Sequence, residues 1–248
     1  MKKLTSHLLP IFFLVILSIA VHHTWFTNLS PITSGDWYVD YSEKLNEYFS
    51  FPIMWNSDYS FGTPNLGVSF WPFLSFVGFL SNLNFSPYLI ERIVFLWPIA
   101  ILLPLGAYFL SYYLFRSTIA SIVSALIFEF NTYMIILQGG HLTLLMAISL
   151  TPFFLLFFLK TLSSSKLFLA VITSLIGFMI SFYEFRIFYL AVWMVFFYLI
   201  YHLTILREFK GLIDFVKKLA LSLTIIIIIL LLNFYFFFRH IWYAILSR

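Results

Sequence analysis

Residues 87–115 read PYLIERIVFLWPIAILLPLGAYFLSYYLF, a run long and apolar enough to cross a bilayer as one helix. Such a crossing needs about 20 apolar residues for a hydrocarbon core of roughly 30 Å. Runs of comparable length recur between polar breaks and predict about seven crossings, near Leu8–Phe26, Pro87–Phe115, Thr118–Leu137, His141–Lys160, Lys166–Tyr183, Phe185–Leu206 and Phe215–Phe238. The expected fold class is an all-α integral membrane protein, with residues 1–248 forming a single polytopic domain.

The composition agrees with this fold class. The chain is 62% hydrophobic and 22% aromatic, and its mean hydropathy is +0.99. A water-soluble domain of this length has too little interior to bury so much apolar surface. The net charge of +4 forms no basic cluster with interleaved aromatic residues, which argues against a nucleic-acid partner. The sequence contains no cysteine, which excludes disulfides and thiolate metal sites.

The N-terminal segment has two interpretations. It begins MKKL, continues into an apolar run, and has small residues at Ser18 and Ala20 that resemble a signal-peptidase site. The apolar character nevertheless continues to Phe26, and further crossings follow. We therefore expect an uncleaved first crossing.

The positions of the charges predict the orientation. With a cytoplasmic N-terminus, the basic residues of the connections fall on the cytoplasmic side, as the positive-inside rule requires. These residues are Lys2, Lys3, Arg116, Lys160, Lys166, Arg207, Lys210, Lys217 and Lys218. The prediction is a multi-pass protein of the plasma membrane and cell envelope, and it assumes that the short apolar segment Val68–Leu80 is interfacial or re-entrant. If that segment crossed the membrane, the predicted orientation of every later crossing would be reversed.

The first outer loop, about residues 27–86, is the only long polar segment, and functional residues concentrate on such loops. On a helix its carboxylates fall within about 60° of one another, opposite an aromatic face. They are Asp36, Asp40, Glu43 and Glu47. This pattern predicts an amphipathic helix in the membrane interface, over Asp36–Ser50, whose acidic face is either simply solvated or functional. Asp36 stands at the start of that helix after Gly35, where its carboxylate would face a substrate at the lipid surface.

The residues that follow carry a family resemblance. The loop reads SGDWYVDYSEKLNEYFSFPIMWNSDYSFGTPNLGVSFWP, and its distinctive positions are Gly35, Asp36, Pro52, Trp55, Asn56, Asp58, Gly62 and Pro64. It resembles the first outer loop of the polytopic GT-C glycosyltransferase superfamily, particularly the YfhO-like branch. Gly140-His141 before a span with Thr151-Pro152, and the FYEFRIFYL stretch, are also compatible with that branch.

The resemblance implies a function. In that superfamily the Asp of the first outer loop acts as catalytic base or orients the substrate, and the donor is usually a sugar on a polyprenyl phosphate. This makes Asp36 the expected catalytic residue, with capping of the helix as its competing role. Asp40, Trp55 and Asp58 are then expected to bind substrate. No cofactor is required, although Asp36 and Asp40 would suit a divalent cation, Mg²⁺ or Mn²⁺.

Six further polar residues are candidate substrate contacts. They are Glu129, His141, Glu184, Arg186, Arg239 and His240. Arg239 either binds a lipid-linked phosphate or extends its side chain to the lipid headgroups (snorkelling). Glu129 lies within a span, so it is expected to face the interior, either in a structural hydrogen bond or against a sugar. Glu184 and Arg186 are two residues apart, a spacing that predicts no pairing on a helix.

Two other functions remain open at this stage. A lipid or solute transporter is the first, although the polar residues concentrate in one outer loop rather than at the midplane. The second is a non-catalytic or truncated subunit with a partner membrane protein. GT-C enzymes commonly continue with more spans and a soluble domain, whereas this sequence ends at Arg248.

Overall fold

A computed structural model describes residues 2–28, 45–50, 55–56, 63–64, 67–206 and 211–234 of the chain. These residues are almost all helical. The elements are α1 (Lys2–Val21), α2 (His23–Thr27), η1 (Leu45–Phe49), β1 (Trp55–Asn56), β2 (Thr63–Pro64), α3 (Gly67–Asn82), α4 (Pro87–Glu91), η2 (Arg92–Leu96), α5 (Trp97–Phe115), α6 (Thr118–Phe130), α7 (Thr132–Gln138), α8 (Leu142–Ser164), α9 (Leu167–Tyr183), α10 (Phe185–Tyr201), η3 (His202–Leu206) and α11 (Leu212–Leu232). η1 is a 3₁₀ turn, and η2 and η3 are π-helical.

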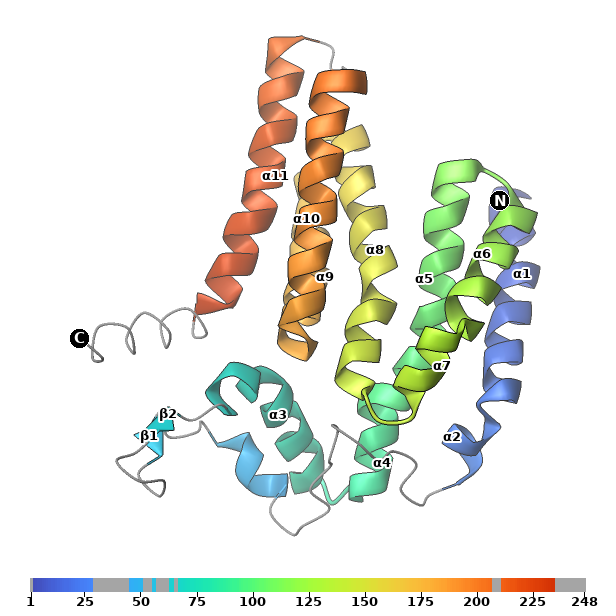
Figure 1. The fold of residues 1–248 in the computed structure, drawn as a ribbon, viewed down its shortest axis with the longest axis vertical. Coiled ribbons are helices and arrows are strands. Elements are labelled where there is room, and N and C mark those ends of the chain that lie inside the picture. Colours follow the sequence, from blue (N-terminus) through green and yellow to red (C-terminus); the bar gives the residue numbers. More distant parts are fainter. Residues whose placement is uncertain are drawn as a thin grey trace.

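The long helices stand side by side and form one bundle (Figure 1). α8 is its central helix and packs against α5, α9, α10 and α11, while α1 and α6 flank α5. The short elements α2, α3 and α4 lie together at the lower end in this view. The bundle therefore has one end that carries tight turns and another that carries α3 and η1.

Tight turns make successive helices antiparallel. α5 ends at Arg116 and α8 ends at Ser165, and both residues adopt the left-handed conformation that closes a helix. The Ser117 hydroxyl then accepts a hydrogen bond from the Ala120 N–H and caps α6. Chain reversal within two residues leaves each helix against the preceding one.

Three helices are long and apolar enough to cross a membrane: Pro87–Phe115, Leu142–Ser164 and Leu212–Leu232. The pair α6 and α7 makes a fourth if it counts as one span, although it bends by 48° at Asn131. This confirms the prediction of an α-helical membrane protein. Three of the seven predicted crossings coincide with shorter apolar helices, which are His7–Val21, Leu167–Tyr183 and Phe185–Tyr201.

Small polar side chains join helices inside the bundle. The Ser174 hydroxyl donates to the carbonyl oxygens of Ala170 and Ile225, at 2.8 and 3.4 Å. The Ser181 hydroxyl donates to Asn233 Oδ1 at 3.1 Å. Such residues allow close helix approach and keep their hydroxyls satisfied where water is scarce.

The segment Val68–Leu80 lies within α3, a helix of 16 residues that is not among the helices long enough to span. It packs against η1, α4 and α9. Within the predicted interfacial helix Asp36–Ser50, the structure describes residues 45–50 and gives a 3₁₀ turn there. Leu45 is buried and Glu47 is exposed, so these two residues follow the predicted polarity.

Candidate functional site

Several of the predicted site residues fall outside the described residues. These are Asp36, Asp40, Asp58, Arg239 and His240. Trp55 belongs to β1, where it pairs with Pro64 of β2, so the two ends of the Trp55–Pro64 segment lie side by side. The proposed Asp36/Asp40 cation site therefore also lies outside the described residues. Within the described ranges, no three His, Asp or Glu side chains are grouped as a metal site would require.

Glu184 and Arg186 form an ion pair, which corrects the prediction that they do not pair. Arg186 donates from Nε to Glu184 Oε1 at 2.8 Å and from Nη2 to Oε2 at 2.9 Å. The prediction was wrong because Glu184 is not inside a helix. Its backbone is extended and it forms the N-cap of α10, so the carboxylate folds back over the first turn and also accepts from the Arg186 N–H.

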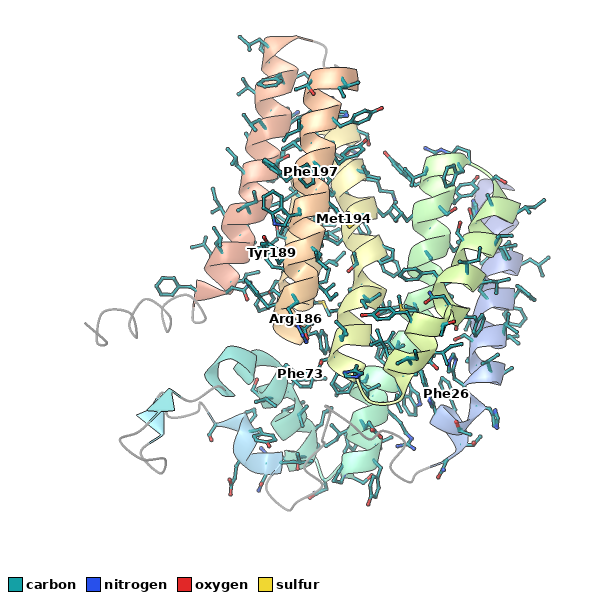
Figure 2. The ribbon with its side chains drawn as sticks, viewed as in Figure 1. Phe26, Phe73, Arg186, Tyr189, Met194 and Phe197 are labelled. Atoms are coloured by element: carbon teal, nitrogen blue, oxygen red, sulfur yellow. The ribbon has the colours of Figure 1, made fainter. Side chains whose placement is uncertain are left out.

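This ion pair sits at the N-terminal end of α10. Hydrogen bonding from Arg186 lowers the pKa of the Glu184 carboxyl below its usual value, an effect that outweighs partial burial. The Arg186 side chain is 80% exposed and that of Glu184 is 15% exposed. Figure 2 shows Arg186 at the lower end of α10, with Phe73 of α3 below it. A guanidinium is therefore held in a fixed orientation at the surface of this end.

His141 begins α8, as the Gly139-Gly140 sequence predicts. Its side chain is half-buried and does not cap the helix. α7 leads into this turn and packs against α8. His141 is thus positioned at the same end of the bundle as the start of α10 (Figure 1).

Glu129 faces the bundle interior, as predicted, and is fully buried. Among the described residues, neither of its carboxyl oxygens has a hydrogen-bond donor. The closest ionisable group is His22, whose Nδ1 lies 3.9 Å from Glu129 Oε1. Glu129 therefore belongs to a cluster with the end of α1 that sequence reasoning did not identify.

A second buried ion pair lies at the junction of α4 and η2. Arg92 Nη1 lies 3.6 Å from Glu91 Oε2, and neither side chain has any exposed surface. Arg92 also donates to the carbonyl oxygens of Tyr88, at 2.7 Å, and of Asn28. Asn28 is the last residue described before the segment that contains Asp36, so Arg92 anchors the near end of that segment.

Aromatic side chains form the wall between α3 and the bundle. The Phe73 ring lies 5.3 Å from that of Phe95 and 5.4 Å from that of Tyr183. The rings are tilted relative to one another, an arrangement that stabilises aromatic contacts beyond the area they bury. α3 is thereby fixed against η2 and the end of α9, one residue before Glu184.

An apolar groove of about 330 Å³ lies between α10 and α11. Its lining includes Phe154 and Phe158 from α8, Phe188 and Leu199 from α10, and Ile226 from α11. The groove begins two residues beyond Arg186, and at 1.5 Å per residue it follows α10 for about 16 Å.

Sequence reasoning missed His22, Gln138 and Arg92. A histidine and an arginine inside apolar runs are themselves signals, because ionisable groups at such positions are costly. Their partners lie far away in the sequence, however, and one sequence does not show which residues meet.

No family model, curated protein or solved structure matches this chain.

Proposed function

We propose that this chain is the membrane core of a glycosyltransferase that takes its sugar from a polyprenyl-phosphate donor on the outer face of the plasma membrane. The observation that carries the proposal is the apolar groove between α10 and α11, whose lining on α10 starts at Phe188, two residues after Arg186 in the chain. A lipid-linked donor needs an apolar channel for its tail and a cation for its phosphate, and α10 carries both part of the groove lining and Arg186. The loop resemblance to GT-C enzymes supplies the reaction type.

The groove suits part of an isoprenoid tail. Its volume of about 330 Å³ is at the lower end of ligand pockets, so it would hold a section of the tail while the rest stays in lipid. The lining side chains are almost all apolar and many are aromatic, with Ser222 the polar exception. Branched hydrocarbon packs well against such a surface.

The donor phosphate would then lie near Arg186. A guanidinium matches phosphate oxygens bidentately and stabilises the charge that develops on a phosphate leaving group. Glu184 holds the guanidinium in place through two charge-assisted hydrogen bonds. We assign His141, Arg239 and His240 to the same phosphate region and Glu129 to the second candidate function below.

Asp36 is the proposed catalytic base. Its carboxylate would take the proton of the acceptor hydroxyl while that oxygen bonds to the anomeric carbon and the bond to the donor phosphate breaks. Asp40, Trp55 and Asp58 would position the sugar, and Asp36 with Asp40 would hold any divalent cation. Arg92 supports this arrangement by fixing Asn28, at the start of the segment.

Seven crossings with a cytoplasmic N-terminus form part of the proposal. The turns after α5, α8 and α10 lie at the end of the bundle opposite α3 (Figure 1). The first two carry Arg116 and Lys166, and Lys218 lies near the start of α11 at the same end. Under the positive-inside rule this end is cytoplasmic. The loop of about residues 27–86 would then face outside.

The test is transfer of labelled sugar from a panel of polyprenyl-phosphate donors by the protein in nanodiscs. Asp36→Asn should abolish transfer and leave folding intact. Asp214→Asn makes the same chemical change at the opposite end of the bundle and should keep activity. Undiminished turnover by Asp36→Asn would overturn the assignment of the base. Absence of transfer by the folded wild type, with or without co-purified membrane proteins, would overturn the transferase proposal.

A transporter is the second candidate function, and the break between α6 and α7 favours it. Discontinuous helices with a buried carboxylate near the midplane are typical of transporter sites. Glu129 immediately precedes that break. Substrate flux in reconstituted vesicles that depends on Glu129 and not on Asp36 would support transport over transfer.

A further inference from the structure

Glu129 is a fully buried carboxylate that lies beside Ser18 and His22. Its side chain has no exposed surface, and among the described residues neither Oε1 nor Oε2 receives a hydrogen bond. Two further polar atoms in this cluster also lack partners there: Ser18 Oγ and Gln138 Nε2. An ionised carboxylate in such a place is strongly unfavourable unless a cation or a proton compensates it.

The geometry of the His22 ring identifies the compensating group. Its Nδ1 lies 2.9 Å from the Ser18 carbonyl oxygen and 3.9 Å from Glu129 Oε1. Its Nε2 lies 3.2 Å from Gln138 Oε1. Nδ1 donates to the Ser18 carbonyl oxygen; Nε2 donates to Gln138 Oε1 when the ring is the imidazolium cation, and accepts from the Gln138 amide N–H when the ring is neutral, so the site accommodates both forms.

The residues of this cluster come from three segments, α1, α6 and α7. Glu129 lies 11 residues after Thr118, about 16 Å along a span whose hydrocarbon core measures roughly 30 Å. The helix breaks two residues later, where Asn131 Oδ1 accepts from the Met134 N–H and caps α7. Gln138 extends from α7 beyond the break, and Ser18 and His22 belong to the end of α1. The cluster thus links the end of α1, the end of α6 and α7.

Within the described residues, no titratable group other than His22 is recorded in contact with the Glu129 carboxyl. α6 packs against α1, α5 and α7. On α5 the Tyr108 and Tyr112 rings lie against His7, and the Tyr113 hydroxyl donates to Ser163. Tyr133 of α7 is exposed. Among the residues that the structure describes, His22 is the one ionisable side chain recorded within 4 Å of the Glu129 carboxyl.

We propose that His22 and Glu129 form one buried proton-binding site at the α6–α7 break. The empty site holds a neutral imidazole and a carboxylate. A proton from water binds on the imidazole to give imidazolium beside carboxylate, or passes to Glu129, where an O–H bond forms as the N–H bond breaks. The occupied site is neutral in both forms, so proton binding removes the uncompensated charge from the membrane interior. This site does not depend on the transferase chemistry at Asp36.

The test is a pH titration of the full chain in nanodiscs, from about pH 4 to about pH 10, a range that brackets ordinary Glu and His values. Infrared difference spectra follow the carboxyl group, and ¹⁵N spectra of labelled histidine follow the ring. Because one proton is shared, the two signals should change with a common midpoint. Glu129→Gln should remove the carboxyl change and lower the proton affinity of His22 about tenfold, which corresponds to one pH unit.

The neighbouring histidine provides the matched control. His23 is exposed, so His23→Gln should leave both signals unchanged, whereas His22→Gln should shift the carboxyl midpoint. Glu129→Asp keeps a titrating carboxyl and serves if Glu129→Gln does not fold. Independent midpoints for the two groups, or a carboxyl signal that His22→Gln leaves in place, would overturn the proposal.

Discussion

The backbone of Phe49 rests directly on Gly78, so that a Cβ added to Gly78 would meet the Phe49 nitrogen and lie 2.9 Å from its Cα and 2.8 Å from the carbonyl carbon of Tyr48. This close approach holds η1 against α3. Gly78→Ala should therefore separate the two and destabilise the fold by about 1–3 kcal/mol, although alanine is the better helix former. Thermal unfolding in detergent and proteolysis near residues 45–50 measure the effect.

Gly177→Ala is the matched control for this prediction. The atom closest to a Cβ at Gly177 is Ile229 Cδ1, at 2.7 Å, and the end of a flexible side chain moves more easily than backbone. The higher helix propensity of alanine, worth about 1 kcal/mol, should offset most of the cost there. Equal destabilisation by the two variants would contradict the proposed role of the Gly78 contact.

The Glu184–Arg186 pair should make stability depend on pH. Because Arg186 lowers the pKa of Glu184, the pair stabilises the fold above the ordinary Glu value of about 4.3, and this is lost as the pH falls through the lowered value. Glu184→Gln should cost about 1 kcal/mol or less near neutral pH, because Arg186 is largely exposed and screened, and nothing at low pH. In an Arg186→Gln background the same change should show no such pH dependence in thermal unfolding. A cost that persists at low pH would assign the stabilisation to helix capping instead.

The sequence was sufficient to predict the helices that are long and uninterrupted. Pro87–Phe115 was predicted with the same bounds that the structure gives, because a proline opens it and Arg116 follows the last apolar residue. The division of Thr118–Leu137 was not predicted. Asn131 both caps α7 and donates to the carbonyl oxygens of Ile127 and Phe128, and this local competition for backbone groups leaves no trace in apolar periodicity.

The candidate site was less predictable because its contacts are distant in sequence. His22 and Gln138 are 116 residues apart, and the Arg92 contact with Asn28 spans 64 residues. Glu184 and Arg186 are close in sequence, yet their pairing was not predicted. The rule that residues two apart on a helix do not face each other does not apply, because Glu184 lies just outside the helix. The burial of Glu129 was predicted because a carboxylate within a membrane span is costly unless it faces the protein interior, whichever residues surround it there.

Arg92 and Glu91 should be strongly coupled. Arg92→Met leaves a buried carboxylate beside an apolar side chain and should cost about 3–5 kcal/mol. Adding Glu91→Leu removes that charge and should recover at least half of the loss in unfolding experiments. The double variant still lacks the hydrogen bond to Asn28, so proteolysis just after Asn28 should remain faster than in the wild type. Equal stability of the single and double variants would contradict the coupling.

Two adjacent isoleucines in α11 test the groove. Ile226 lines it and Ile227 does not, although the two side chains are similarly exposed, at 46% and 54%. Ile226→Trp should fill part of the volume and weaken binding of a polyprenyl-phosphate donor about tenfold, whereas Ile227→Trp should face lipid and leave binding unchanged. Equilibrium binding of a fluorescent donor to the protein in nanodiscs measures both. If the two variants bind alike, the tail lies elsewhere on the bundle, and the groove no longer supports a lipid-linked substrate.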